Sequence, residues 1–295
     1  MQLKMKKSTF GRTKDGTKAQ LFRIPNNTED YIEVSTYGCA IKGIFIHNRE
    51  GKLQNVFCGM ETLRNYELSV MGNGSIVGAV SKSSPSAAHA HKVWDVAEVG
   101  ENFVFLTCRE SAEESGCGCE VTIGVQIMWV NLNRLIVDAY VTPEKDAEIS
   151  LECRCFFKLQ EAERDGYGLR TFAQEVIGED GPMGKTENTP FRNLSFQPLP
   201  HEVTFLSRDP QIKPMAELAS TQSQITISAY SSMVSLLAKK AEELGGVEIQ
   251  QGMHHAVFLK SGETLTGRVI YGFDKLYSKD EVENPEPTPF SALCK

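Results

Sequence analysis

Long hydrophobic runs are missing from this sequence. No apolar stretch approaches the roughly 18 residues that a membrane span needs, and the opening residues MQLKMKKSTF lack the apolar segment of a secretory signal. We therefore expect a soluble protein with no membrane partner. Its expected compartment is the cytoplasm, with the nucleus as the alternative.

An excess of positive charge is also missing, because the 295 residues carry a net charge of −7. The basic residues Lys4, Lys6 and Lys7 form only a short cluster at the start of the chain. A diffuse acidic balance of this kind argues against a general nucleic-acid binder. We expect no direct nucleic-acid partner.

Metal-binding spacings such as CxxC or paired histidines are absent as well. The eight cysteines include two CxC pairs, Cys117/Cys119 and Cys153/Cys155. Residues i and i+2 of a strand share a face, so each pair could offer two thiolates to one metal ion. Without further ligands at a suitable spacing, we favour buried, reduced thiols and predict neither a metal nor a cofactor.

Helical patterns are scarce, and short β-like runs separated by turn residues dominate. A short helical turn fits 60–67, whereas 235–244 is compatible with either a helix or the end of a strand. Asn131 and Asn133 predict a hairpin between two long strands. The β-like runs fall at 20–24, 31–38, 40–46, 92–99, 102–108, 119–130, 134–141, 148–160, 202–206, 224–231, 255–259 and 265–273.

Many strands with almost no helix predict an all-β fold, either a large sandwich or a barrel. No linker-like composition occurs before residue 283, so we expect one domain over 1–283. The Pro-rich segment 284–295 is predicted to be an extended or disordered tail.

The run EISLECRCFFKLQ (148–160) shows the strand alternation clearly. One face carries small and apolar residues, ending at Phe157, and this face is predicted to be buried. The other face carries Glu152, Arg154, Phe156 and Lys158. An arginine in the middle of this second face raises the question of what it contacts.

Several segments, in sequence order, resemble one family, the aldose 1-epimerases or galactose mutarotases. The resemblance implies a large antiparallel β-sandwich of the galactose mutarotase-like (supersandwich) type, whose concave sheet holds a sugar. The segments are FGRTKDGTKAQLFRIPN (10–26), VSTYGCAIKGIFIHNREGKLQNVFCGMETLRNYE (34–67), HKVWDVAEV (91–99), NTPFRNLSF (188–196) and SGETLTGRVIYGF (261–273).

The residues expected at the family's site differ from the family pattern. Arg154 aligns with the family's catalytic histidine, and Gln250 aligns with its catalytic glutamate. Glu248 lies two residues before Gln250, on the same strand face, and a register shift would bring it into the glutamate's place. The family's Asp-His pair that touches the sugar resembles Pro200-His201.

Mutarotation requires a general base for the anomeric hydroxyl proton and a general acid for the ring oxygen. An arginine guanidinium stays charged at neutral pH, and an amide does not act as a base there. The resemblance therefore implies a mutarotase-like protein that has lost its chemistry and serves as a binding or protein-interaction module. The alternative is an active aldose 1-epimerase or hexose-6-phosphate epimerase-like enzyme with relocated acid and base residues.

The candidate ligand is a sugar or sugar phosphate, and a protein partner is the other candidate. Arg154 either contacts such a ligand or forms a salt bridge with Glu152 or Glu248. Trp94 and Trp129 are expected in the core rather than stacked on a sugar. The candidate ligand-binding residues are His89, His91, Arg154, His201, Glu248 and Gln250. The histidines among them, like His254 and His255, could instead be solvated loop residues.

Overall fold

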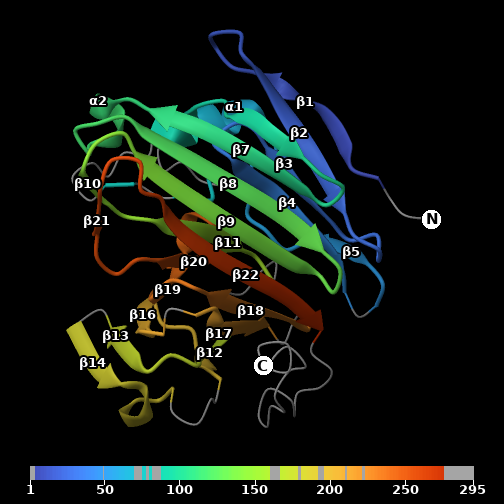
Figure 1. Cartoon of the computed structure of the whole chain (residues 1–295). Helices are drawn as coiled ribbons and strands as arrows, with labels where there is room; N and C mark the ends of the chain where they lie inside the picture. Colours follow the sequence, from blue (N-terminus) through green and yellow to red (C-terminus); the bar gives the residue numbers. More distant parts are fainter. Residues whose placement is uncertain are drawn as a thin grey trace.

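The computed structural model of the chain describes most of the sequence, and the predicted tail at 284–295 lies outside the described residues. In the described part every paired strand is antiparallel, which confirms the expected all-β architecture (Figure 1). The described residues are 4–48, 50–69, 75–77, 80–81, 88–159, 167–178, 181–191, 196–209, 211–220 and 223–275.

A nine-stranded sheet forms the framework, with long neighbouring strands that run across the middle of Figure 1. In β8 every second residue from Val121 to Trp129 is completely buried, because the strand alternation turns one face to the core. In sheet order the strands are β15 (Gln197–Pro198), β12 (Tyr167–Thr171), β17 (Lys213–Ser220), β18 (Ile225–Ser231), β22 (Leu265–Lys275), β9 (Arg134–Pro143), β8 (Val121–Val130), β7 (Phe103–Glu110) and β6 (Asp95–Val99).

A six-stranded sheet carries the residues of interest, and a two-stranded sheet adjoins it. The six strands are, in order, β11 (Glu152–Phe157), β20 (Gly246–Gly252), β19 (Ser235–Ala241), β16 (Glu202–Leu206), β13 (Glu175–Gly178) and β14 (Gly181–Lys185). The two-stranded sheet pairs β10 (Ala147–Ile149) with β21 (Val257–Leu259).

The fourth sheet comes from the N-terminal part of the chain and is drawn in blue in Figure 1. Its strands are, in order, β1 (Lys6–Arg12), β2 (Lys18–Pro25), β3 (Tyr31–Ser35), β4 (Ala40–His47) and β5 (Leu53–Asn55). The helical elements are short: α1 (Leu63–Leu68), η1 (Ala88–His91), α2 (Ala112–Ser115), η3 (Thr186–Asn188) and η5 (Glu242–Leu244).

One hydrophobic cluster joins the sheets into a sandwich. It includes Ile24 from β2, Ile123 from β8, Cys155 from β11 and Ile249 from β20. Side chains from elements far apart in the sequence therefore share one core, as expected for sheets packed face to face.

Two predicted elements differ in detail from the structure. The single strand predicted over 148–160 is two strands, because β10 pairs with β21 while β11 pairs with β20. The break at Ser150 and Leu151 is invisible in the sequence, since the same alternation of buried residues continues across it. The ambiguous run 235–244 is the strand β19 followed by the 3₁₀ turn η5.

The strand β17 has no counterpart among the predicted strands. Its sequence, KPMAELAS, contains residues that favour helices. It lies between β12 and β18, and residues on both of its faces are buried. Tertiary pairing and burial override local propensity here.

Candidate functional site

Arg154 lies on the face of the six-stranded sheet that is opposite the core. Its β11 neighbours Cys153 and Cys155 are completely buried on the core face. Across the strands, Arg154 is directly opposite Gln250 of β20, and Gln250 is opposite Leu237 of β19. Directly opposed side chains have Cβ atoms about 5 Å apart. Arg154 and Gln250 therefore form a cross-strand pair.

The next row of the same face carries alternating charges. Glu248 lies opposite Phe156 on one side and Lys239 on the other, and Lys239 pairs with Glu202 of β16. The Lys239 Nζ atom is 3.4 Å from Glu202 Oε2, and both side chains are about two-fifths exposed. We call the surface formed by Arg154, Gln250, Glu248 and Lys239 the Arg154 face.

Burial raises the pKa of Glu248 above its ordinary value. Arg154 and Lys239 act in the opposite direction and lower this pKa, while Glu202 raises it further. Burial is the largest of these effects, so the Glu248 carboxyl holds its proton more strongly than an exposed glutamate does. Glu248 is a titrating group on a surface where Arg154 and Gln250 do not exchange protons near neutral pH.

One hydrogen-bond donor of the Arg154 guanidinium has no acceptor in the described part of the chain. Its Nε atom is buried and has no hydrogen-bond partner among the described residues. Arg154 and Glu248 are diagonal neighbours on the paired strands β11 and β20, so their opposite charges attract. A buried N–H group without an acceptor is costly to the folded protein.

The backbone of β11 is held along its outer edge by two segments. The Arg154 amide donates to the Ile76 carbonyl oxygen at 2.7 Å, and Val77 forms an isolated bridge with Cys153. Further along, Phe57 forms a bridge with Phe157. Arg154 thus stands on a strand that is paired on both sides.

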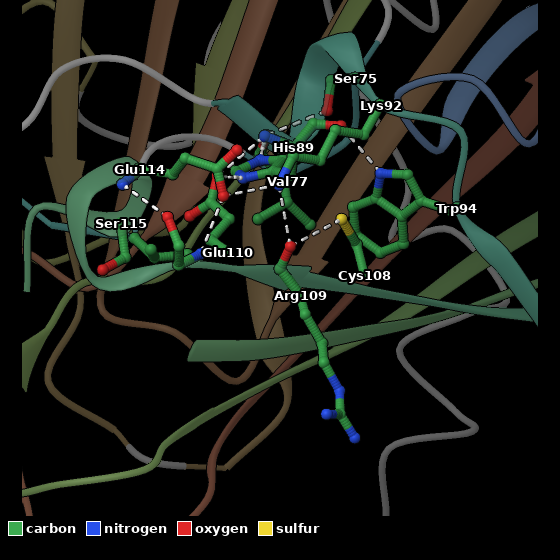
Figure 2. Close-up of polar contacts among 12 residues, drawn as sticks. Ser75, Val77, His89, Lys92, Trp94, Cys108, Arg109, Glu110, Glu114 and Ser115 are labelled. Atoms are coloured by element: carbon green, nitrogen blue, oxygen red, sulfur yellow. Dashed lines mark hydrogen bonds and ion pairs between the residues drawn. The ribbon is translucent and has the colours of Figure 1, made fainter. Parts of the chain in front are cut away.

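His89 does not offer a ligand contact, contrary to the expectation from the sequence. It is completely buried, and both of its ring nitrogens are occupied. Nδ1 lies 2.9 Å from Glu110 Oε1, and Nε2 lies 3.0 Å from the Val77 carbonyl oxygen (Figure 2). It is not a solvated loop residue either, because the 3₁₀ turn η1 carries it inward.

The other predicted histidines lie elsewhere. His91 is exposed and lines an open groove of about 420 Å³ with Tyr37, among other residues, and the lining of that groove does not include the Arg154 face. His201, next to the partly exposed Pro200, is exposed just before β16, and its carbonyl oxygen accepts the Lys240 amide at 2.9 Å. His254 and His255 contact one another with ring centroids 4.4 Å apart. The structure therefore brings together Arg154, Gln250 and Glu248 but not the histidines.

Both tryptophans are in the core, as predicted, with exposed fractions of 2% for Trp94 and 0% for Trp129. Lys239 and Glu202 were not identified from the sequence. Both lie on the non-core side of strands whose alternation is readable, but their proximity to Glu248 depends on the order β20-β19-β16. No signal within 202–206 or 235–241 alone reveals that order.

Comparison with known proteins identifies the fold. No protein-family profile matches the sequence, and no curated protein does. Among solved structures, an aldose epimerase homologue from C. elegans is similar at a TM-score of 0.77 and 15% identity, over 88% of this chain and 99% of that one. Galactose 1-epimerase from Lactobacillus acidophilus is similar at a TM-score of 0.76 and 12% identity, over 93% of this chain and 100% of that one.

A galactose mutarotase-like protein from Lactobacillus casei is also similar, at a TM-score of 0.61 and 15% identity, over 86% of this chain and 100% of that one. The chain therefore has the galactose mutarotase-like β-sandwich fold that the sequence resemblance implied. No helix among the described residues is long and apolar enough to cross a membrane.

Proposed function

We propose that this protein binds a carbohydrate on the Arg154 face and does not catalyse mutarotation. The cross-strand pair of Arg154 and Gln250 carries this proposal. The sequence resemblance assigns these two positions to the acid and the base of the epimerases. A guanidinium and an amide cannot exchange protons with a sugar near neutral pH. Neither of the two positions therefore carries a residue that can perform the proton transfer that mutarotation requires there.

The same residue types suit binding. Arginine presents a fixed fork of donors, glutamine offers both a donor and an acceptor, and the Glu248 carboxylate accepts. Neighbouring hydroxyl groups of a sugar need this mixture.

Binding and catalysis are tested separately. Calorimetry with galactose, glucose, galactose 6-phosphate and glucose 6-phosphate should show saturable binding of at least one sugar. Arg154→Ala should weaken it by about tenfold or more, since a charge-assisted hydrogen bond is lost. No binding of any of the four, or unchanged affinity in R154A, would contradict the carbohydrate proposal in favour of a protein-interaction role.

Polarimetry with freshly dissolved α-galactose and α-glucose should show no catalysed rotation above buffer. The double variant R154H/Q250E supplies a titrating ring and a carboxylate at the two positions and is expected to gain activity. R154Q/Q250E is its matched control, because it contains the same carboxylate without the ring. Catalysed rotation by the unmodified protein would contradict the loss of chemistry.

A second function, an active epimerase with relocated groups, is favoured by one observation. Burial raises the pKa of Glu248, which brings its proton exchange closer to neutral pH. In this alternative Glu248 exchanges protons with the sugar, and Arg154 binds a phosphate in the hexose-6-phosphate version. Rotation that is present in the unmodified protein and abolished in E248Q would establish it.

A further inference from the structure

A buried His–Glu pair contacts the segment that covers the edge of the strand carrying Arg154. The side chains of His89 and Glu110 are 0% and 1% exposed, and His89 Nδ1 is 2.9 Å from Glu110 Oε1. The His89 backbone N–H donates to the same carboxylate oxygen at 2.8 Å. Figure 2 shows the ring between Glu110 on one side and Val77 on the other.

The chemistry of the partners determines how the ring is protonated. The Val77 carbonyl oxygen can only accept, so His89 Nε2 carries a hydrogen and donates to it at 3.0 Å. The Nδ1 contact with Glu110 is then an imidazolium with a carboxylate, or a neutral ring with a carboxylic acid. Both forms are neutral overall, and in both forms Nε2–H points at Val77.

The Val77 carbonyl belongs to the segment that covers the outer edge of β11. Val77 is bridged to Cys153, and the preceding carbonyl, that of Ile76, accepts the Arg154 amide at 2.7 Å. We propose that the His89–Glu110 pair is a positioning unit, which fixes the edge segment 75–77 and thereby the backbone from which Arg154 reaches its ligand. This inference rests on the proposed carbohydrate site.

The pair is itself firmly held on its far side. Trp94 Nε1 donates to the His89 carbonyl oxygen at 2.9 Å, and the two rings meet edge to face with centroids 5.9 Å apart. Lys92, the residue after η1, accepts the Gly38 amide through its carbonyl at 2.8 Å and pairs with Glu114 at 2.7 Å. Because His89 is held in this way, its Nε2–H bond fixes the position of the Val77 carbonyl.

Position matters because β11 is the edge strand of the six-stranded sheet. An edge strand relies on whatever covers it, and the described residues 75–77 contact β11 through the Val77 bridge and the Ile76 hydrogen bond. Ser75 Oγ also donates to the Val77 carbonyl oxygen, at 3.2 Å. This oxygen therefore accepts hydrogen bonds from both His89 and Ser75.

Two matched double variants separate positioning from plain stabilisation. H89Q/E110Q removes the titratable pair but keeps a side-chain N–H that can reach the Val77 carbonyl. H89L/E110Q removes the same pair and fills the space with a group that cannot donate. The readouts are hydrogen exchange of the Arg154 amide, followed by NMR, and the calorimetric affinity for the probe sugar, here galactose.

The positioning role predicts that H89Q/E110Q keeps both readouts within about threefold of the unmodified protein. In H89L/E110Q the Arg154 amide should exchange about tenfold faster, and galactose should bind about tenfold more weakly. Equal effects of the two variants, in proportion to their loss of global stability, would overturn the inference. If the unmodified protein does not bind galactose, the proposed function fails for this sugar, but the exchange readout still decides the positioning role.

A measurement on the unmodified chain covers the case in which neither variant folds. In native-state hydrogen exchange with increasing denaturant, the Arg154 amide and the Trp94 indole N–H should be exposed in the same opening event. Exchange of the Arg154 amide through a separate opening of lower free energy would show that the pair does not hold it.

Discussion

The pKa of Glu248 is determined by burial and by its charged neighbours. Burial on the Arg154 face disfavours its charged form, and the attraction of Arg154 and Lys239 offsets this only in part. The carboxyl therefore costs the folded protein more when it is ionised than when it is protonated.

We predict a pH-dependent effect of Glu248→Gln on stability. Because the pKa of Glu248 is raised in the folded state, its contribution to stability is greatest below about pH 4 and is lost as the pH rises through the folded-state pKa. The free energy of unfolding of the unmodified protein relative to E248Q should therefore fall between pH 4 and neutrality, as checked by urea unfolding at about four pH values.

Lys239→Met supplies the companion variant, because Lys239 lowers the pKa of Glu248. Its removal should raise the pKa of Glu248 further, so the loss of stability should extend to higher pH. Parallel pH profiles for the unmodified protein and E248Q would contradict the assigned environment of Glu248.

The hairpin that joins β8 and β9 illustrates what a single element can encode. Val130 and Arg134 pair across its base, and Leu132 and Asn133 have φ angles of 62° and 52°. Asparagine tolerates this left-handed region, as the sequence pattern Asn131 to Asn133 indicated. Asn133 Oδ1 also accepts a hydrogen bond from Asn26 Nδ2 at 2.6 Å. Leu132 is 69% exposed, and leucine does not tolerate the left-handed region as asparagine does.

We predict that Leu132→Asn raises the free energy of unfolding by about 0.5–1 kcal/mol, because a residue that accepts the left-handed region replaces one that is strained there. Thermal or urea unfolding measures the effect. Asn133→Ala is the control and should lower stability by about 1 kcal/mol or more, since it loses both the hydrogen bond and the tolerance. A neutral or destabilising L132N would show that Leu132 makes contacts that compensate its backbone.

At the scale of the whole molecule, one core links sheets whose strands are far apart in the sequence. Cysteines from several elements contribute to it: Cys39, Cys153 and Cys155 are completely buried. Burial raises the pKa of Cys153 to about 12 and that of Cys39 well above the ordinary value. Thiols in this environment are neither nucleophilic nor accessible.

Thiol labelling should therefore report global unfolding. With iodoacetamide and peptide mapping by mass spectrometry, Cys39, Cys153 and Cys155 should be labelled only in parallel with the unfolding transition, because they share one core. Cys58 and Cys117 are partly exposed and should be labelled earlier. Labelling of Cys153 well before Cys39 would mean that the six-stranded sheet opens separately.

The predictable part of this protein follows from strand alternation. The alternation in 148–160 was sufficient to place Arg154 opposite the core and Cys153 and Cys155 within it. The pairing of Arg154 with Gln250 could not be predicted from local pattern, because the two residues are 96 positions apart and such a pattern does not specify a strand's partner. The burial of His89 could not be predicted from the sequence, because it depends on contacts with Glu110 and Val77 from other segments.

The sequence by itself predicted many of the strands and the side of each that faces the core. These are properties of residue type and of a period of two along one segment. Only the tertiary structure decided the order of the strands, the break between β10 and β11, the charged neighbours of Glu248 and the buried pair of His89 and Glu110. Each of these depends on contacts between distant segments, whose energy arises only after the sheets have assembled.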